Sequence, residues 1–370
     1  MRIILSGGGT AGHITPAIAI AETVLTYDRT AEITFVGTPH GMENELVGRA
    51  GYPMRHVNVR GFSRSLSLRN IGALYLALVS PLRAERILAD LCPDIVIGTG
   101  GYASWPILRA AARRGIPCAV HESNAVPGMT VKRLAPLVSE VWLNFKEANR
   151  YLPKNSSRFL ETGNPIRRDF RTVSRGEARK RLGLTEKDFL LLSFGGSLGA
   201  ARINEVAPLL GAALLPRFQN LRYVHGSGRA HYEEMCKKEG GFFHPRFSLL
   251  PYIEDMPLYM GAADTVICRA GAMTISELSL CQKSAILIPS PNVADDHQTK
   301  NAMLLEKSGA AAVMEESLLS AEGLAAQVAR LIEDPLLRAE RERRIRRFSH
   351  PDANGRILSR VLELTQKNPK

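Results

Sequence analysis

Two glycine-rich stretches follow apolar runs and precede helical patterns, and both contain the residue types that bind phosphate. The first, Ser6–His13, places Gly7, Gly9 and Gly12 at the spacing of dinucleotide-binding loops. The second covers Gly195–Ala200. Glycines let the backbone approach a phosphate, and the N-terminus of the following helix supplies positive field. The sequence therefore predicts two anion-binding loops, with tight strand–helix packing as the alternative explanation of the glycines.

The first loop lacks a feature that NAD-binding loops need. In NAD sites an acidic residue at the end of the second strand holds the ribose. Here that strand ends near Thr38, and the nearest acidic residue is Glu43. We therefore disfavour NAD binding and expect no cofactor.

His13 directly follows the first loop. An imidazole with an ordinary pKa near 6.5 can act as a general base around neutral pH. The alternative is a histidine that caps the helix or sits in solvent. The residues alone leave both interpretations open.

Polar loops also follow other predicted strands in both halves of the chain. Because parallel strands end at one edge of their sheet, ligands normally bind there. We therefore expect a site in a cleft between two domains. The loops are Gly98–Pro106, His121–Gly128, Cys268–Glu277 and Pro289–Gln298.

The elements that position these loops are apolar runs alternating with helical stretches. Such alternation predicts an α/β fold with parallel sheets. Gly and Pro interrupt the pattern near Thr162–Pro165, so we expect domains at 1–163 and 164–350. Residues 351–370 form a helical tail, for which packing back on the N-terminal domain is one arrangement. The predicted strands are Arg2–Leu5, Ile33–Val36, Asp94–Ile97, Cys118–Val120, Val141–Leu143, Phe189–Phe194, Leu221–Val224, Phe247–Leu249, Thr265–Ile267 and Ala285–Ile288.

Composition limits the class of protein. A chain of 370 residues with 45% hydrophobic and 23% charged residues is globular and long enough for two domains. Its five cysteines form no C-x-x-C pair, which disfavours a disulfide framework, a zinc site or a redox motif. The apolar run at Ile3–Leu5 is too short for a signal peptide, so we expect no secretion. No stretch reaches the ~20 apolar residues that span a bilayer, so any membrane contact is expected to be peripheral.

The net charge of +12 predicts an anionic partner. Nucleic acid is disfavoured, because zinc-finger spacing and RNP-like aromatic motifs are absent and aromatic residues make up only 6%. A basic cluster at Arg338–Arg347 alternates with glutamates and is typical of a solvated helix.

Six motifs in order closely resemble the MurG family of bacterial glycosyltransferases, over about residues 2–309. They are GGGTAGH (7–13), GTGGYASWP (98–106), HESNAVPG (121–128), TGNPIR (162–167), FGGSLGAARIN (194–204) and CRAGAMTISEL (268–278). The resemblance implies a GT-B fold, in which two Rossmann-like domains face each other across a cleft. It also implies transfer of GlcNAc from UDP-GlcNAc to lipid I, giving lipid II for peptidoglycan synthesis.

The resemblance implies that the C-terminal domain binds UDP-GlcNAc. Glu277 would accept hydrogen bonds from both ribose hydroxyls. Arg167 and Ser197, with the amides of Gly196 and Leu198, would meet the diphosphate. The other donor contacts that it implies are Ile253, Ala272, Met273, His297 and Gln298.

Two of these assignments have a competing interpretation. Many family members carry Gln–Gln where this chain has His297 and Gln298, which puts sugar contact by His297 in doubt. Glu277 can also be explained as an acidic residue in the first turn of a helix, which the helix dipole favours.

The same resemblance assigns lipid I to the N-terminal domain. His13 would remove the proton from the C4 hydroxyl of MurNAc, and Glu122 is a second candidate base or an orienting partner. Gly9, Gly100, Gly101 and Tyr102 would contact the acceptor. Thr10, Gly12 and Asn124 are assigned to the donor and are also candidates to line the acceptor pyrophosphate and sugar.

The implied reaction is a single inverting displacement. Helix N-termini and Arg167 would stabilise the leaving UDP. No Asp-x-Asp motif occurs in the chain, so we expect catalysis without a metal.

A basic amphipathic segment covers Arg60–Arg86 and has apolar residues at helical spacing. Such a helix lies in a bilayer interface or packs on its own sheet with a solvated basic face. Since the acceptor is lipid-bound, we favour the first arrangement. We expect a peripheral protein on the cytoplasmic face of the bacterial plasma membrane, with an anionic lipid surface and other cell-wall synthesis proteins as partners.

Two other functions fit parts of the pattern. A UDP-GlcNAc 2-epimerase would bind the same nucleotide sugar but need no lipid acceptor. A nucleotide-binding module without catalysis would tolerate loss of His13.

Overall fold

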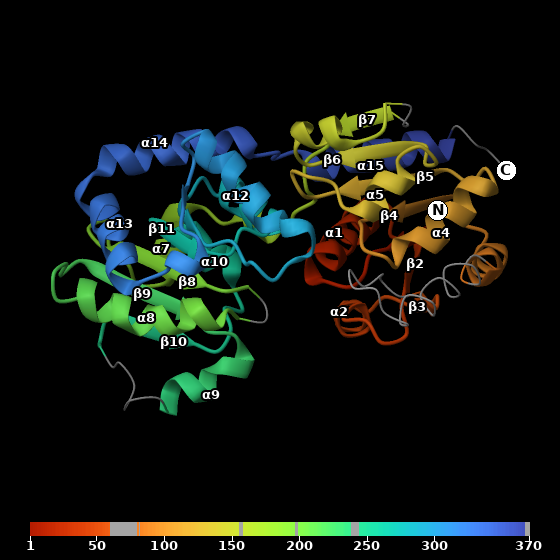
Figure 1. The fold of residues 1–370 in the computed structure, drawn as a ribbon. Helices are drawn as coiled ribbons and strands as arrows, with labels where there is room; N and C mark the ends of the chain where they lie inside the picture. Colours follow the sequence, from red (N-terminus) through yellow and green to blue (C-terminus); the bar gives the residue numbers. More distant parts are fainter. Residues whose placement is uncertain (60–79, 81, 155–157, 197–198, 238–243, 367–370) are drawn as a thin grey trace. The chain divides into compact units, whose positions relative to one another are not determined.

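The computed structural model describes residues 1–59, 80, 82–154, 158–196, 199–237, 244–366 (Figure 1). These residues form two compact units. Unit 1 comprises Met1–Ile166 and His350–Lys370, and unit 2 comprises Arg167–Ser349. The unit boundary thus falls three residues after the expected position of 163/164.

Unit 1 contains a sheet in the order β3-β2-β1-β4-β5-β6-β7, and every neighbouring pair of strands is parallel. The strands are β1 (Arg2–Ser6), β2 (Glu32–Gly37), β3 (Met54–His56), β4 (Ile95–Gly98), β5 (Cys118–Glu122), β6 (Glu140–Leu143) and β7 (Arg158–Glu161). The helices are α1 (Ala11–Tyr27), α2 (Glu43–Arg49), α4 (Ser104–Arg113), α5 (Met129–Leu134) and α15 (Ala353–Gln366), with residues 82–91 also helical.

Alternate residues of the unit 1 strands enter different cores. Ile3 and Leu5 pack with the apolar faces of α1 and α15, whereas Ile4 packs with α4 and α5. A strand that buries both faces has no polar alternation, which explains why these strands read as continuous apolar runs.

Unit 2 contains a second parallel sheet in the order β10-β9-β8-β11-β12-β13. The strands are β8 (Phe189–Phe194), β9 (Leu221–Gly226), β10 (Phe247–Leu250), β11 (Thr265–Cys268), β12 (Ser284–Leu287) and β13 (Ala312–Val313). The helices are α6 (Asp169–Thr172), α7 (Arg175–Arg181), α8 (Ala201–Leu214), α9 (Arg229–Lys237), α10 (Met256–Ala262), α11 (Ala272–Leu280), α12 (His297–Lys307), α13 (Ala321–Glu333) and α14 (Pro335–Ile345).

The α/β class with parallel sheets is confirmed, and the ten predicted strands are present. Three short strands were not predicted, namely β3, β7 and β13. Each lies at a sheet edge, where one neighbour is missing and the apolar signal is correspondingly weak. The basic cluster at Arg338–Arg347 forms α14 and the turn after it, with Arg344 paired to Glu340 at 2.5 Å.

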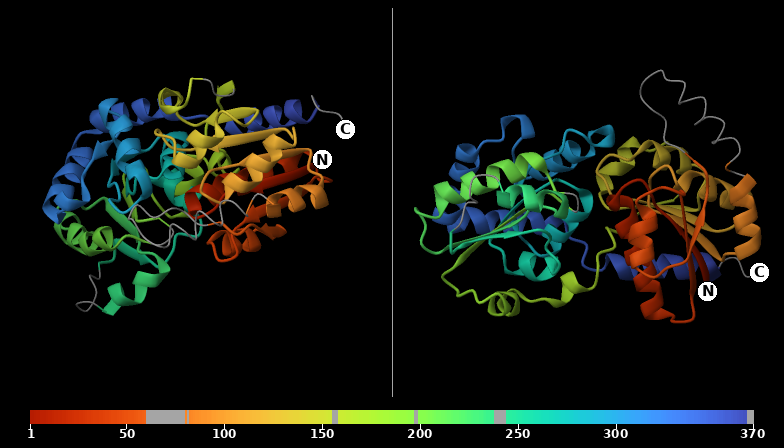
Figure 2. Two further views of the ribbon diagram at one scale, coloured as in Figure 1. Left: turned by 45° about the vertical axis from the view of Figure 1, so that its right-hand side comes forward. Right: turned by 90° about the horizontal axis from the view of Figure 1, so that it is seen from below.

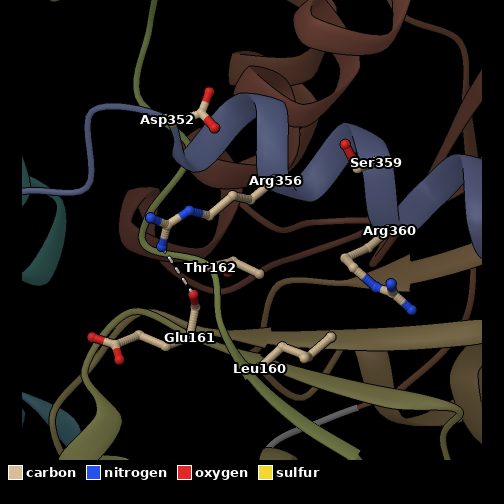
Figure 3. A pocket seen from close by; sticks show the side chains of 7 residues that line it. All are labelled: Leu160, Glu161, Thr162, Asp352, Arg356, Ser359 and Arg360. Carbon is tan, nitrogen blue, oxygen red and sulfur yellow. Dashed lines mark hydrogen bonds between the residues drawn. The ribbon is translucent and has the colours of Figure 1, made fainter.

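The C-terminal helix α15, drawn in dark blue in Figure 2, belongs to unit 1 and packs on α1. Its Arg360 donates to both carboxylate oxygens of the buried Glu140, at 3.1 and 2.5 Å. Arg356 donates to the backbone oxygen of Glu161 on β7 (Figure 3). The two arginines line a cavity of about 280 Å³ between α15 and β7, and none of the predicted site residues lines it.

No helix among the described residues is both long and apolar enough to span a bilayer. Most of the basic amphipathic segment at Arg60–Arg86 lies outside the described residues. Its described end is helical, and Leu82 there is 67% exposed.

Candidate active site

The loops after β1 and β4 of unit 1 pack directly on each other. A Cβ atom on Gly7 would lie 2.2 Å from Oγ1 of Thr99, and one on Gly101 would lie 2.1 Å from the backbone oxygen of Gly8. Gly100 has a φ of 103°, and a Cβ atom there would lie 2.6 Å from Nδ1 of His13. Two motifs that are about 90 residues apart in sequence therefore form one cluster because glycines leave room for it.

His13 lies in the first turn of α1 and is held from the neighbouring strand. Its Nδ1 is 3.1 Å from the backbone oxygen of Thr99, and the Thr99 hydroxyl donates to the backbone oxygen of His13 at 2.6 Å. A carbonyl only accepts hydrogen bonds, so Nδ1 carries the proton and Nε2 is the basic atom. His13 therefore neither caps the helix nor sits free in solvent. Its geometry suits a general base.

Other predicted N-terminal residues surround the start of α1. Gly9, Thr10 and Gly12 are exposed, and Tyr102 lies against Gly9, where a Cβ atom would be 3.1 Å from the Tyr102 ring. Thr10 is the N-cap residue of α1, but its side chain makes no capping hydrogen bond. This end of unit 1 thus combines an open helix N-terminus with the side chain of His13.

Glu43 belongs to this cluster, although the sequence analysis predicted no role for it. Its buried carboxylate accepts hydrogen bonds from the Gly9 amide at 3.2 Å and from the amide and hydroxyl of Thr38 at 2.8 and 2.7 Å. Burial raises the pKa of Glu43, but the hydrogen bonds from Thr38 and Gly9 outweigh it, so the pKa is lowered. The carboxylate therefore holds the glycine loop, a role distinct from binding a ribose.

A sequence signal for Glu43 exists in the glycines around it. A Cβ atom on Gly37 or Gly41 would lie 2.6 or 2.1 Å from a side-chain atom of Glu43. Glycines two and six positions before this acidic residue leave room for its carboxylate to turn inward.

Glu122 lies at the end of β5 and is buried. Its carboxylate accepts from the amide and side chain of Asn124 at 2.9 and 3.0 Å and from the Gly128 amide at 2.9 Å. Burial raises the pKa of Glu122, against the lowering effect of these hydrogen bonds. In this arrangement Glu122 shapes the Ser123–Gly128 loop and orients Asn124.

The glycine loop after β8 in unit 2 is built differently. Gly199 has a φ of 80°, and a Cβ atom there would lie 2.2 Å from the backbone oxygen of Ser227. Gly196 has a φ of 93°, and no atom of the described residues lies within 4 Å of where its Cβ atom would be. The N-cap of α8 is Ala200, whose side chain cannot cap, so the first amides of α8 have no side-chain acceptor there. Ser197 and Leu198 lie outside the described residues.

Arg167 and Glu277 are brought into electrostatic contact within unit 2. Burial raises the pKa of Glu277, and the positive charge of Arg167 opposes this effect. The resulting pKa is about 7. Arg167 also stacks over the ring of Phe170, with its guanidinium carbon 5.7 Å from the centroid. Glu277 lies in the second turn of α11, not the first, so the helix-dipole explanation for this acid is wrong.

Four other predicted donor residues lie in unit 2, three of them at the starts of helices and one in a loop. Ala272 and Met273 open α11, and Ile253 is buried against Gly226, where a Cβ atom would lie 2.8 Å from its Cδ1 atom. Gln298 accepts a hydrogen bond from the Ser290 amide at 2.9 Å, which fixes its side chain to the loop after β12.

His297 is the first residue of α12 and follows two strained residues. Asp295 and Asp296 have φ angles of 53° and 52°, which non-glycine residues rarely adopt. Such strain is common where a loop is shaped for binding.

Family models match both units of the chain. The glycosyltransferase family 28 N-terminal domain matches residues 3–142, and the family 28 C-terminal domain matches residues 190–357. A protein of Thermoanaerobacter sp. (strain X514) is 40% identical over 99% of this chain and 100% of its own. It is named UDP-N-acetylglucosamine--N-acetylmuramyl-(pentapeptide) pyrophosphoryl-undecaprenol N-acetylglucosamine transferase.

Solved structures give the same relationship. The crystal structure of Acinetobacter baumannii MurG is 29% identical, with a TM-score of 0.76 over 99% of both chains. A UDP-GlcNAc 2-epimerase from Neisseria meningitidis, solved with UDP-GlcNAc, has a TM-score of 0.65 over 100% of both chains. It is only 13% identical, so it shows a shared GT-B type of fold and nothing about activity. The chain belongs to glycosyltransferase family 28 and, within it, to the MurG family.

Proposed function

We propose that the chain transfers GlcNAc from UDP-GlcNAc to the C4 hydroxyl of MurNAc in lipid I, giving lipid II for peptidoglycan synthesis. The family relationship supports this reaction. The observation that carries the proposal is the orientation of His13, whose Nδ1 donates to Thr99 and whose Nε2 is therefore the basic atom.

The chemistry is a single displacement. His13 Nε2 takes the proton of the acceptor C4 hydroxyl, and the oxygen forms a bond to C1 of GlcNAc. The bond from C1 to the diphosphate oxygen breaks, and its electron pair leaves with UDP. Attack opposite the leaving group converts the α-linked donor into a β-1,4-linked product.

The residues of unit 2 serve the donor in this proposal. Glu277 accepts from the ribose hydroxyls, and Arg167 with the first amides of α8 offsets the charge of the diphosphate. The side chains of Gln298 and His297 contact the GlcNAc hydroxyls. In unit 1, Gly9, Gly100, Gly101 and Tyr102 contact lipid I, and Glu122 positions Asn124.

The test is release of UDP from UDP-GlcNAc in EDTA, with and without a lipid I analogue. We expect release only with the acceptor, together with a disaccharide product. Release without acceptor would instead indicate an epimerase or a hydrolase. Binding of UDP-GlcNAc with no release under either condition would contradict the transferase assignment.

Association with the cytoplasmic face of the plasma membrane is the second part of the proposal. It is supported by the exposed Leu82, Arg83 and Arg86 at the described end of the basic segment. Each basic residue near an anionic surface contributes about 1 kcal/mol to binding. We expect the chain to sediment with vesicles containing phosphatidylglycerol and not with phosphatidylcholine alone. The double variant Arg83→Glu/Arg86→Glu should bind the anionic vesicles more weakly, and equal binding would contradict this arrangement.

A further inference from the structure

Five buried polar groups form one continuous hydrogen-bonded chain in unit 2. Oγ of Ser193 lies 2.9 Å from the Tyr223 hydroxyl and 2.7 Å from Nδ1 of His225. Nε2 of His225 lies 3.1 Å from Oδ1 of Asn204, whose Nδ2 donates to the backbone oxygen of Ser227 at 2.9 Å. All five residues are buried.

The direction of every hydrogen bond in this chain follows from its last member. The Ser227 oxygen is a carbonyl and only accepts, so the amide nitrogen of Asn204 must face it and the amide oxygen must face His225. His225 Nε2 therefore carries the proton, which leaves Nδ1 to accept from the Ser193 hydroxyl. The Ser193 oxygen then accepts from the Tyr223 hydroxyl. The chain is fully satisfied in one arrangement of protons, with His225 neutral.

The hydrogen-bonded chain ends beside the second glycine loop. Asn204 donates to the Ser227 carbonyl, and Gly199 packs against the same carbonyl. A Cβ atom on Gly199 would lie only 2.2 Å from that oxygen. The Gly199 amide donates to the Gly196 oxygen at 3.0 Å, and the Asn204 amide donates to the Ala200 oxygen at 2.9 Å. Asn204 thus ties the first turn of α8 and the end of β9 to the same loop.

We infer that Tyr223, Ser193, His225 and Asn204 are positioning residues that hold Gly199, Ala200 and the first amides of α8 where the donor diphosphate binds. The inference rests on the proposed function, because the diphosphate is its ligand. The sheet brings two members of the hydrogen-bonded chain together, since Ser193 and His225 are direct partners in the β8–β9 pairing. Burial lowers the pKa of His225 to about 4, so this arrangement persists throughout neutral pH.

The test replaces the amide nitrogen that faces the Ser227 carbonyl. Asn204→Asp places a second acceptor there, so the loop must shift although the side chain keeps its size. We expect the Kd for UDP to rise about tenfold or more, as for loss of one buried hydrogen bond. The Kd for uridine, which has no phosphate, should stay within about twofold of wild type. UDP would be measured by titration calorimetry and uridine by NMR titration.

Matched variants separate positioning from general damage. Ser279 also lies in unit 2, and its buried hydroxyl donates to the backbone oxygen of Ile275, which is not part of the hydrogen-bonded chain. Ser279→Ala should therefore leave both affinities unchanged. Tyr223→Phe removes only the outermost link and should have a smaller effect than Asn204→Asp. If Asn204→Asp does not fold, Ser193→Ala carries the test, with the same expected loss of UDP affinity relative to uridine.

Three results would overturn the inference. UDP and uridine affinities that fall by the same factor would indicate general damage to unit 2. UDP and uridine affinities that both stay at the wild-type value in a folded variant would show that the hydrogen-bonded chain does not position the diphosphate site. A wild-type protein that binds no UDP would refute the proposed function, and the inference with it.

Discussion

The two glycine loops begin alike in sequence and differ in what holds them. In unit 1 a charged carboxylate, Glu43, accepts from the loop, and the loop after β4 packs against it. In unit 2 a hydrogen-bonded chain of neutral side chains, which ends at Asn204 and the Ser227 carbonyl, contacts the loop instead. No atom of the described residues lies within 4 Å of the Cβ position of Gly196. The same strand–loop–helix pattern therefore gives a closed loop that presents His13 and an open loop suited to an anion.

A glycine motif therefore specifies a backbone path, and the residues around it determine the chemistry. Gly7 and Gly101 are needed because other backbone or side-chain atoms occupy their Cβ positions. Gly196 is needed for its positive φ, and Gly12 meets neither requirement. The four predictions below test this contrast, beginning with the largest expected effect.

Replacement of His13 should have the largest effect. His13→Ala removes the base that only the first loop carries, and we expect transfer to fall about 10³-fold, within the range for loss of a general base. Affinity for UDP-GlcNAc should be unchanged, because unit 2 is intact. Turnover with a lipid I analogue and donor titration together provide the measurement. Turnover within about threefold of wild type would remove His13 as the base.

Loss of the carboxylate should destabilise the first loop. Glu43→Ala leaves the donors of Thr38 and Gly9 without their acceptor, and we expect a loss of about 3 kcal/mol in the free energy of unfolding at pH 7. The folded-state pKa of Glu43 is lowered, so its contribution is present above its ordinary pKa near 4.5 and is lost as pH falls. Urea unfolding of both proteins should therefore converge in acid. A difference that grows below pH 4 would contradict the assigned role.

Donor binding in unit 2 should depend on pH through Glu277. Its pKa of about 7 means that the carboxylate form, which accepts from two ribose hydroxyls, increases as pH rises. We expect affinity for UDP-GlcNAc to increase about tenfold between pH 6 and pH 8, following the ionised fraction. UDP-GlcNAc has no phosphate that titrates in this range, so the dependence belongs to the protein. Glu277→Gln should bind more weakly and show a flat profile; a steep profile in that variant would assign the dependence elsewhere.

The smallest effect concerns a glycine that the fold does not need. A Cβ atom on Gly12 would meet only Oγ1 of Thr10, at an ordinary 3.7 Å, and Gly12 lies in α1. Gly12→Ala should therefore raise the free energy of unfolding by up to about 1 kcal/mol. If Gly12 lies at the substrate, as the family resemblance implies, transfer should still fall about fivefold, which corresponds to ~1 kcal/mol.

Gly48 provides the matched control for that change. It lies in α2, and nothing lies within 4 Å of its Cβ position. Gly48→Ala should stabilise the protein by a similar amount and leave transfer unchanged. Equal activities of the two variants would indicate that Gly12 makes no substrate contact.

The class of fold and the positions of the candidate binding and catalytic loops were predictable from the amino-acid sequence. Apolar runs without alternation identified ten strands, most of them buried, because strands covered on both faces need no polar residues. The glycine loops, His13 and the polar strand ends were identifiable because each is local in sequence. The family motifs then assigned substrates to the two halves.

The contacts that hold those residues in place could not be predicted from the sequence and come from the folded structure. Glu43 reaches Gly9 across 34 positions, and Thr99 reaches His13 across 86. The hydrogen-bonded chain from Tyr223 to Ser227 forms only where β8, β9 and α8 meet. Likewise, α15 packs in unit 1 although unit 2 lies between it and the rest of unit 1 in the sequence. Hydrogen bonds between distant segments leave no periodic pattern in the sequence, because they require only single residues at the right points in space. The tautomer of His13 and the neutrality of His225 follow from such bonds.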